Sequence, residues 1–96
     1  MLVVALLTLR PDAPPLRERL RRRVSWQYPP SVKVIGEYWL NGAPPEHPRI
    51  ITILETENAA ALLPIQAAWS DMYDIAVFPA LTAEEGLRLA SQMGWD

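Results

Sequence analysis

The chain has 96 residues, half of them hydrophobic, and a formal net charge of −2. This balance excludes a disordered chain and gives no overall attraction for nucleic acid, and the length predicts a single domain over residues 1–96. Because there is no cysteine and only one histidine, the composition also excludes disulfides, thiolate metal sites and a multi-histidine metal site within one chain. We therefore expect no metal and no cofactor.

The first third of the chain predicts a strand followed by a helix. Residues 2–9 (LVVALLTL) are apolar without polar alternation, which is typical of a central strand covered on both faces. This stretch is too short to span a membrane, so we expect a cytoplasmic protein that makes no membrane contact. Apolar residues then recur at four-residue spacing after Pro15, and this predicts an amphipathic helix over residues 16–28 with its stripe at Leu16, Leu20 and Val24.

A β-hairpin is predicted next. Residues 31–41 alternate, so that one face of this strand carries Val32, Val34, Tyr38 and Leu40, and the other carries Lys33, Ile35, Glu37 and Trp39. Residues 49–55 (RIITILE) form a second apolar strand. The proline-rich segment between the two strands (GAPPEHP) predicts a fairly long loop.

The second half of the chain predicts a helix, an edge strand and a final helix. Asn58 can cap a helix over residues 59–69, and Pro64 inside that segment predicts a kink or a restart of the helix. Residues 72–80 (MYDIAVFPA) are apolar with a proline near the end, as suits an edge strand. Thr82 and Glu85 then form a capping box, which predicts a short C-terminal helix.

This order of elements, β-α-β-β-α-β with an extra C-terminal helix, predicts an α+β fold of the ferredoxin-like type with a four-stranded antiparallel sheet in the order 4-1-3-2. Right-handed crossovers place the first two helices on the same face of the sheet. The opposite face is also apolar but has no helix of its own, and exposing it to water would forgo much of the stability of a small domain. We therefore expect a homodimer that pairs the uncovered sheet faces of two copies.

The segment NAAALLPIQAAWSDMYDIAVFPALTAEE, the start VVALLTLRP and a Gly-Glu-Tyr-Trp strand between them resemble the bacterial family called domain of unknown function 3303. The most specific element is a Trp-Ser-Asp sequence followed by an Asp-containing strand and a proline, here Trp69, Ser70, Asp71, Asp74 and Pro79. The resemblance covers essentially the whole chain and implies the dimeric α+β barrel fold. That superfamily includes cofactor-independent monooxygenases, isomerases and haem-using enzymes, as well as effector domains of regulators. An enzyme acting on a small molecule and a ligand-sensing module are therefore the alternatives to a protein with no assignable reaction.

His47, Asp74 and Glu37 are the candidates for catalysis, and the first two also have a structural interpretation. His47 is the only side chain with an ordinary pKa near neutrality, but its proline-rich loop favours a solvated histidine. Asp74 lies in the predicted edge strand, where a charge discourages unwanted strand pairing. Asp71 and Asp74 are three residues apart, a spacing that points side chains of a strand to opposite faces, so a catalytic carboxylate pair is disfavoured. Glu37 is the one acid on its face of the second strand.

Four aromatic residues are candidates for ligand binding: Trp26, Tyr28, Trp39 and Trp69. Trp69 is expected to be a core anchor at the end of the second helix. The face that carries Glu37 and Trp39 either looks into a cleft between the sheet and the helices, which would form a small-molecule pocket, or faces a partner. Strand alternation does not decide between the two, and we favour interface or core over a ligand site.

Overall fold

The computed structural model describes residues 1–95 and contains one antiparallel sheet in the order β2-β3-β1-β4. Its strands are β1 (Leu2–Leu9), β2 (Lys33–Trp39), β3 (Ile50–Glu55) and β4 (Tyr73–Ala80). This is the predicted strand order 4-1-3-2, with β1 and β3 in the centre and β4 at an edge. The three predictions of an α+β fold, a four-stranded sheet and an additional C-terminal helix are confirmed.

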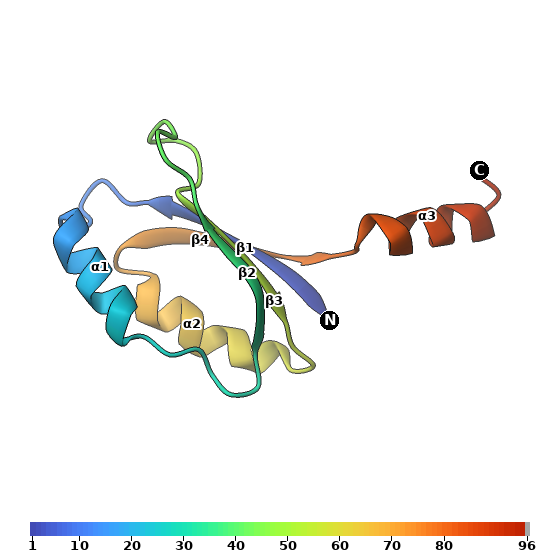
Figure 1. The fold of residues 1–96 in the computed structure, drawn as a ribbon, viewed down its shortest axis with the longest axis horizontal. Helices are drawn as coiled ribbons and strands as arrows, with labels where there is room; N and C mark the ends of the chain where they lie inside the picture. Colours follow the sequence, from blue (N-terminus) through green and yellow to red (C-terminus); the bar gives the residue numbers. More distant parts are fainter. Residues whose placement is uncertain (96) are drawn as a thin grey trace.

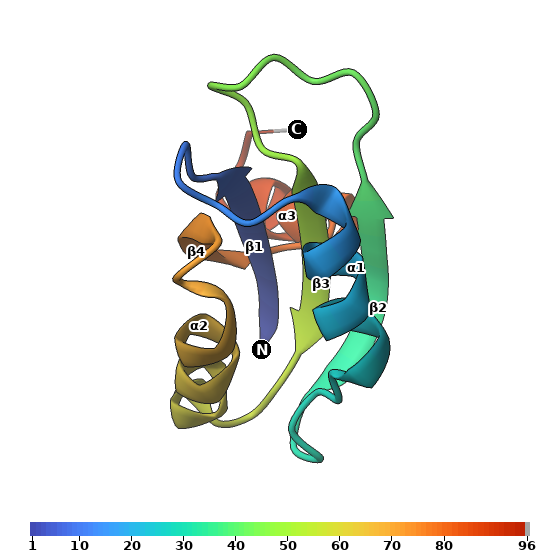
Figure 2. The same cartoon turned by 90° about the vertical axis from the view of Figure 1, so that its left-hand side faces the viewer.

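Two helices cover one face of the sheet. They are α1 (Leu16–Ser25) and α2 (Leu62–Trp69), and Figure 2 looks onto the face that they cover, with α2 over the β4 side and α1 over the β2 side. Helix α1 ends at Ser25, three residues before the predicted end, because Trp26 takes an extended conformation with φ −77° and ψ 139°. The side chains of Trp26 and Tyr28 thereby leave the helix and join the space between helices and sheet.

Helix α2 begins later than its sequence pattern predicts. Asn58 caps the segment as expected, since its side-chain oxygen accepts a hydrogen bond from the Ala60 backbone N–H at 2.9 Å. The first turn, η1 (Ala59–Ala61), is a 3-10 helix, and the α-helix starts at Leu62. Pro64 therefore stands in the first turn of α2, where its missing N–H has no intrahelical partner to lose. Of the predicted kink or restart, the structure shows a change from 3-10 to α-helix at Leu62, two residues before Pro64.

The simple alternation predicted for the second strand is wrong. A register shift lies between Val34 and Gly36, where Val34 pairs with Leu54 and Gly36 pairs with Ile53. This bulge moves Val34 to the helix side, where Glu37 and Trp39 also point, opposite Thr52 and Ile50 of β3. An inserted residue of this kind reverses the alternation beyond it. Glu37 is thus directed into the interior between sheet and helices.

The other face of the sheet has a continuous apolar surface, which we call the open face. Cross-strand pairing aligns its side chains in rows, of which one contains Tyr38, Ile51, Leu6 and Ala76, and the next contains Ile53, Val4 and Phe78. Tyr38 and Phe78 are both more than half exposed. Neither α1 nor α2 reaches this face (Figures 1 and 2).

The C-terminal helix α3 (Ala83–Gln92) projects away from the sheet and from both other helices (Figure 1). Its start is capped as predicted, because the Thr82 hydroxyl accepts a hydrogen bond from the Glu85 N–H at 3.1 Å. Its large apolar side chains are exposed, including Leu87 at 72% and Met93 at 59%. None of the helices within residues 1–95 is long and apolar enough to cross a membrane.

Candidate ligand-binding cleft

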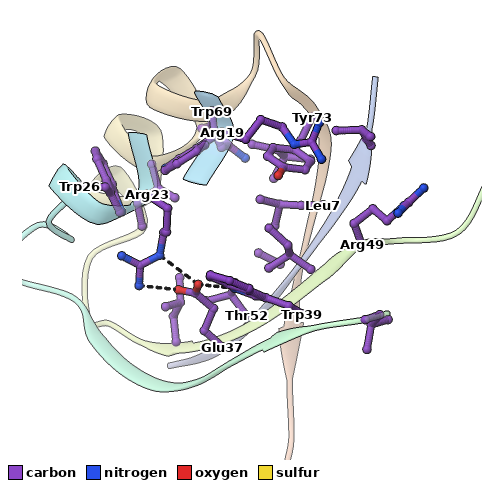
Figure 3. Close-up of a pocket in the computed structure, with 18 of the residues that line it drawn as sticks. Leu7, Arg19, Arg23, Trp26, Glu37, Trp39, Arg49, Thr52, Trp69 and Tyr73 are labelled. Carbon is purple, nitrogen blue, oxygen red and sulfur yellow. Dashed lines mark hydrogen bonds and ion pairs between the residues drawn. The ribbon is translucent and has the colours of Figure 1, made fainter. Parts of the chain in front are cut away.

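The space between the sheet and the helices contains a cavity of about 240 Å³. Its floor consists of inward-facing side chains of all four strands, and its roof comes from α1, α2 and the segment that follows α1. Most of the lining is aliphatic or aromatic, and the labelled side chains in Figure 3 surround the open space. The apolar members include Leu7, Leu20, Ile50, Ile65, Trp26 and Trp69. An apolar lining with a few polar groups is the usual composition of a small-molecule site.

Glu37 is the only carboxylate among the described residues of this lining, and four hydrogen bonds hold it. Arg23 donates through Nε and Nη2 to its two oxygens, each at 3.0 Å, and the two charges form an ion pair. The Tyr28 hydroxyl donates at 2.8 Å and the Trp39 indole N–H at 2.7 Å. A paired, two-pronged guanidinium contact fixes both the position and the orientation of a carboxylate. Figure 3 shows Arg23, Glu37 and Trp39 of this cluster at one side of the cavity.

The protonation states of the cluster follow from these contacts. Burial acts to raise the pKa of Glu37, but the hydrogen bonds from Arg23, Trp39 and Tyr28 together outweigh it, and the pKa lies below its ordinary value. Burial, followed by the hydrogen bond to Glu37, raises the pKa of Tyr28 to about 12. At neutral pH Glu37 is therefore an anion that only accepts hydrogen bonds, and Tyr28 is a neutral donor.

Aromatic rings form one wall of the cavity. Trp26 meets Tyr28 and Trp69 edge to face, with ring centroids 5.9 Å and 6.0 Å apart, and Trp69 lies 6.3 Å from Tyr73. Such contacts stabilise the rings beyond their burial alone. Trp69 is only 6% exposed, which confirms its expected place in the core, whereas Trp39 is 53% exposed. Trp39 therefore stands where the cavity opens to solvent.

The structure brings five of the seven candidate residues together. Trp26, Tyr28, Glu37, Trp39 and Trp69 all line the cavity. The group therefore faces the cleft between the sheet and the helices, and not the open face.

The two remaining candidates lie elsewhere. His47 is in the β2–β3 loop with its side chain 63% exposed, and its nearest carboxylate is that of Glu46 at 4.0 Å. Asp74 is on the open-face side of β4 and forms an exposed ion pair with Arg10 at 3.1 Å. Neither belongs to the cavity lining.

Asp71 and Asp74 do not form a carboxylate pair, because each has its own arginine. Arg22 donates to both oxygens of Asp71, at 2.7 Å and 3.0 Å, and holds the pKa of that carboxyl below its ordinary value. The same guanidinium lies 5.8 Å from the centre of the Trp69 ring. The Trp-Ser-Asp sequence thus fixes the end of α2 against α1.

Three arginines of the cavity were not predicted from the sequence. Arg19 and Arg23 come from α1, and Arg49 directly precedes β3. A signal was present for the first two, since Arg19 and Arg23 are four residues apart and flank the Leu16–Leu20 stripe on the same side of the helix. Arg49 follows the proline-rich loop and carries no such signal.

The strand order and the lined cleft define an α+β protein with a cavity large enough for a small ligand. The chain belongs to the family described as Domain of unknown function (DUF3303), whose family model matches residues 1–94. No curated protein and no solved structure matches this chain. Within residues 1–95, no three histidine, cysteine, aspartate or glutamate side chains are grouped so that they could hold a metal ion.

Proposed function

We propose that the protein binds a small, largely apolar molecule in the cleft between its sheet and its helices. The observation that carries this proposal is a cavity of about 240 Å³ with an aromatic wall and one fixed carboxylate. An apolar cavity of about 150 Å³ is enough to bind benzene, so this one has room for an aromatic ring and several further atoms. The cavity is also accessible from solvent, because Trp39 in its lining is half-exposed.

The chemistry of the cluster supports binding rather than proton transfer. A general acid or base works best when its pKa lies near the operating pH. Glu37 has a lowered pKa and Tyr28 a pKa of about 12, so both are far from that range at neutral pH. They serve instead as a fixed polar group at one side of the cavity, because the Tyr28 hydroxyl already donates to Glu37.

The test is a titration with indole, a neutral aromatic probe, followed by nuclear magnetic resonance of the cavity methyl groups. We expect saturable shifts at Leu7 and Ile50, which line the cavity. Ala5→Leu adds three carbons at a buried cavity position and should weaken indole binding at least tenfold, whereas Ala67→Leu, at an exposed position of α2, should not. Unchanged indole binding by folded Ala5→Leu, or no binding by the unsubstituted protein, would refute the proposal.

We further propose that two copies associate through their open faces in the manner of a dimeric α+β barrel, and that the protein is cytoplasmic. The open face supports association because its two apolar rows span all four strands and include the exposed Tyr38 and Phe78. Apolar area of this extent is commonly an interaction surface. A sequence without cysteine needs no oxidising compartment, which supports the cytoplasm.

Light scattering after size exclusion tests the association. We expect a dimer at micromolar concentration and a shift towards monomer in Phe78→Lys, because the substitution places a charge in the proposed interface. Val24→Lys is the matched control, since Val24 is 86% exposed on α1, on the other side of the sheet. A folded monomer without concentration dependence, or a Phe78→Lys variant that stays dimeric, would contradict the pairing.

A further inference from the structure

Three residues that line the cavity each carry a buried hydrogen-bond donor without an acceptor among residues 1–95. Arg19 Nε, Arg49 Nε and Trp26 Nε1 are all buried without a hydrogen-bond partner among residues 1–95. All three residues line the cavity. Buried polar groups are almost always paired, because leaving one unpaired lowers the stability of the folded protein. The three atoms are all donors, so the missing partner is an acceptor.

The charges of the lining point to an anion. Among residues 1–95, Arg19, Arg23 and Arg49 contribute three positive charges to the lining and Glu37 contributes the only negative one. The described lining therefore has an excess of two positive charges, in a chain whose net charge is −2. Arg23 is already neutralised by Glu37. The uncompensated charges therefore belong to Arg19 and Arg49.

These two arginines are separate from the Glu37 cluster. In Figure 3, Arg23 and Glu37 are joined at one side of the cavity, while Arg19 and Arg49 lie at the other. Arg19 uses one guanidinium nitrogen to hold the Pro14 carbonyl at 2.7 Å, which fixes the side chain but does not compensate its charge. Guanidinium groups are well matched to carboxylates, which they bind through paired, charge-assisted hydrogen bonds.

We propose that the ligand is a small aromatic carboxylate, with its ring among Trp26, Trp69 and Tyr73 and its carboxylate held by Arg19 and Arg49. This inference rests on the proposed function of the cleft and adds the ligand class. The cavity volume of about 240 Å³ limits the ligand to roughly ten non-hydrogen atoms, by comparison with about 150 Å³ for benzene. The mainly apolar lining packs against the ring, and the guanidinium groups of Arg19 and Arg49 donate to the carboxylate and neutralise its charge.

The experiment compares phenylacetate with phenylacetamide, a neutral molecule of nearly the same shape, by isothermal titration calorimetry at neutral pH. We expect the unsubstituted protein to bind phenylacetate at least tenfold more tightly. Arg19→Met and Arg49→Met should each remove most of this preference and weaken phenylacetamide binding much less, because an amide oxygen accepts a hydrogen bond but carries no charge. Circular dichroism of each variant shows that it is folded. Arg17→Met, at an exposed position of α1 outside the cavity, is the matched control and should keep the preference.

Each other outcome contradicts a defined part of the account. Equal binding of the two molecules, or a preference for the amide, would overturn the carboxylate proposal and leave the binding cleft standing. A preference for phenylacetate that survives both arginine substitutions would overturn the roles of Arg19 and Arg49. Binding of neither molecule would overturn the carboxylate proposal, and if indole also failed to bind, the proposed function would fall with it.

Discussion

At the scale of single residues, Arg23–Glu37 and Arg22–Asp71 are two ion pairs of similar geometry in different surroundings. The Glu37 side chain is 13% exposed and has three donor residues, whereas the Asp71 side chain is 57% exposed and is held by Arg22 alone among the side chains described. Solvent screens the second pair much more than the first. The two pairs therefore provide an internal comparison of buried and exposed electrostatics.

We expect Glu37→Gln to lower the free energy of unfolding by about 1–3 kcal/mol, because it weakens hydrogen bonds to a charged and largely buried group. Asp71→Asn should cost less than about 1 kcal/mol. Since the folded pKa of Glu37 is lowered, its contribution is complete above the unfolded pKa of about 4.3 and is lost as the pH falls through the folded value. Urea unfolding of both variants at neutral and acidic pH measures these changes in the free energy of unfolding. A Glu37→Gln effect no larger than that of Asp71→Asn, or one that persists in acid, would contradict it.

At the scale of elements, helix α3 differs from the rest of the fold because its apolar side chains are uncovered. Isolated helices of its length are only marginally stable in water, even with a good cap. We expect rapid amide hydrogen exchange in α3 of the monomeric Phe78→Lys variant, with slow exchange in β1 as the internal reference. Exchange in α3 as slow as in β1 of that variant would show that the helix is stable without a partner.

The elements also show how far the sequence could be interpreted. Continuous apolar runs and turn residues were sufficient to locate the strands, and Thr82 marked the start of α3, because these signals are local. The strand order then followed from the order of the elements along the chain. The bulge at Val34–Gly36 was not predicted, since a register shift depends on how β2 meets β3. It decides the direction of Glu37, so the position of the cluster could not be derived from alternation. Arg49 was missed for the same reason, because only the folded hairpin brings it to the cavity.

At the scale of the whole molecule, one sheet separates two surfaces with different roles. The face under α1 and α2 carries the cavity, and the open face carries the apolar rows. Because the cavity lies on the helix side of the sheet and the proposed interface is the open face, the proposed dimer would hold one ligand per chain. Ligand binding and association can therefore be disrupted separately, by Ala5→Leu and by Phe78→Lys.

The central claim is that the cleft is a binding site, and a crystal structure of the protein grown with indole tests it most directly. We predict ring-shaped density inside the cavity, in contact with Leu7 and Trp69, once in every chain. Density found only on the outer surface, or a cleft that side chains have closed, would contradict the account.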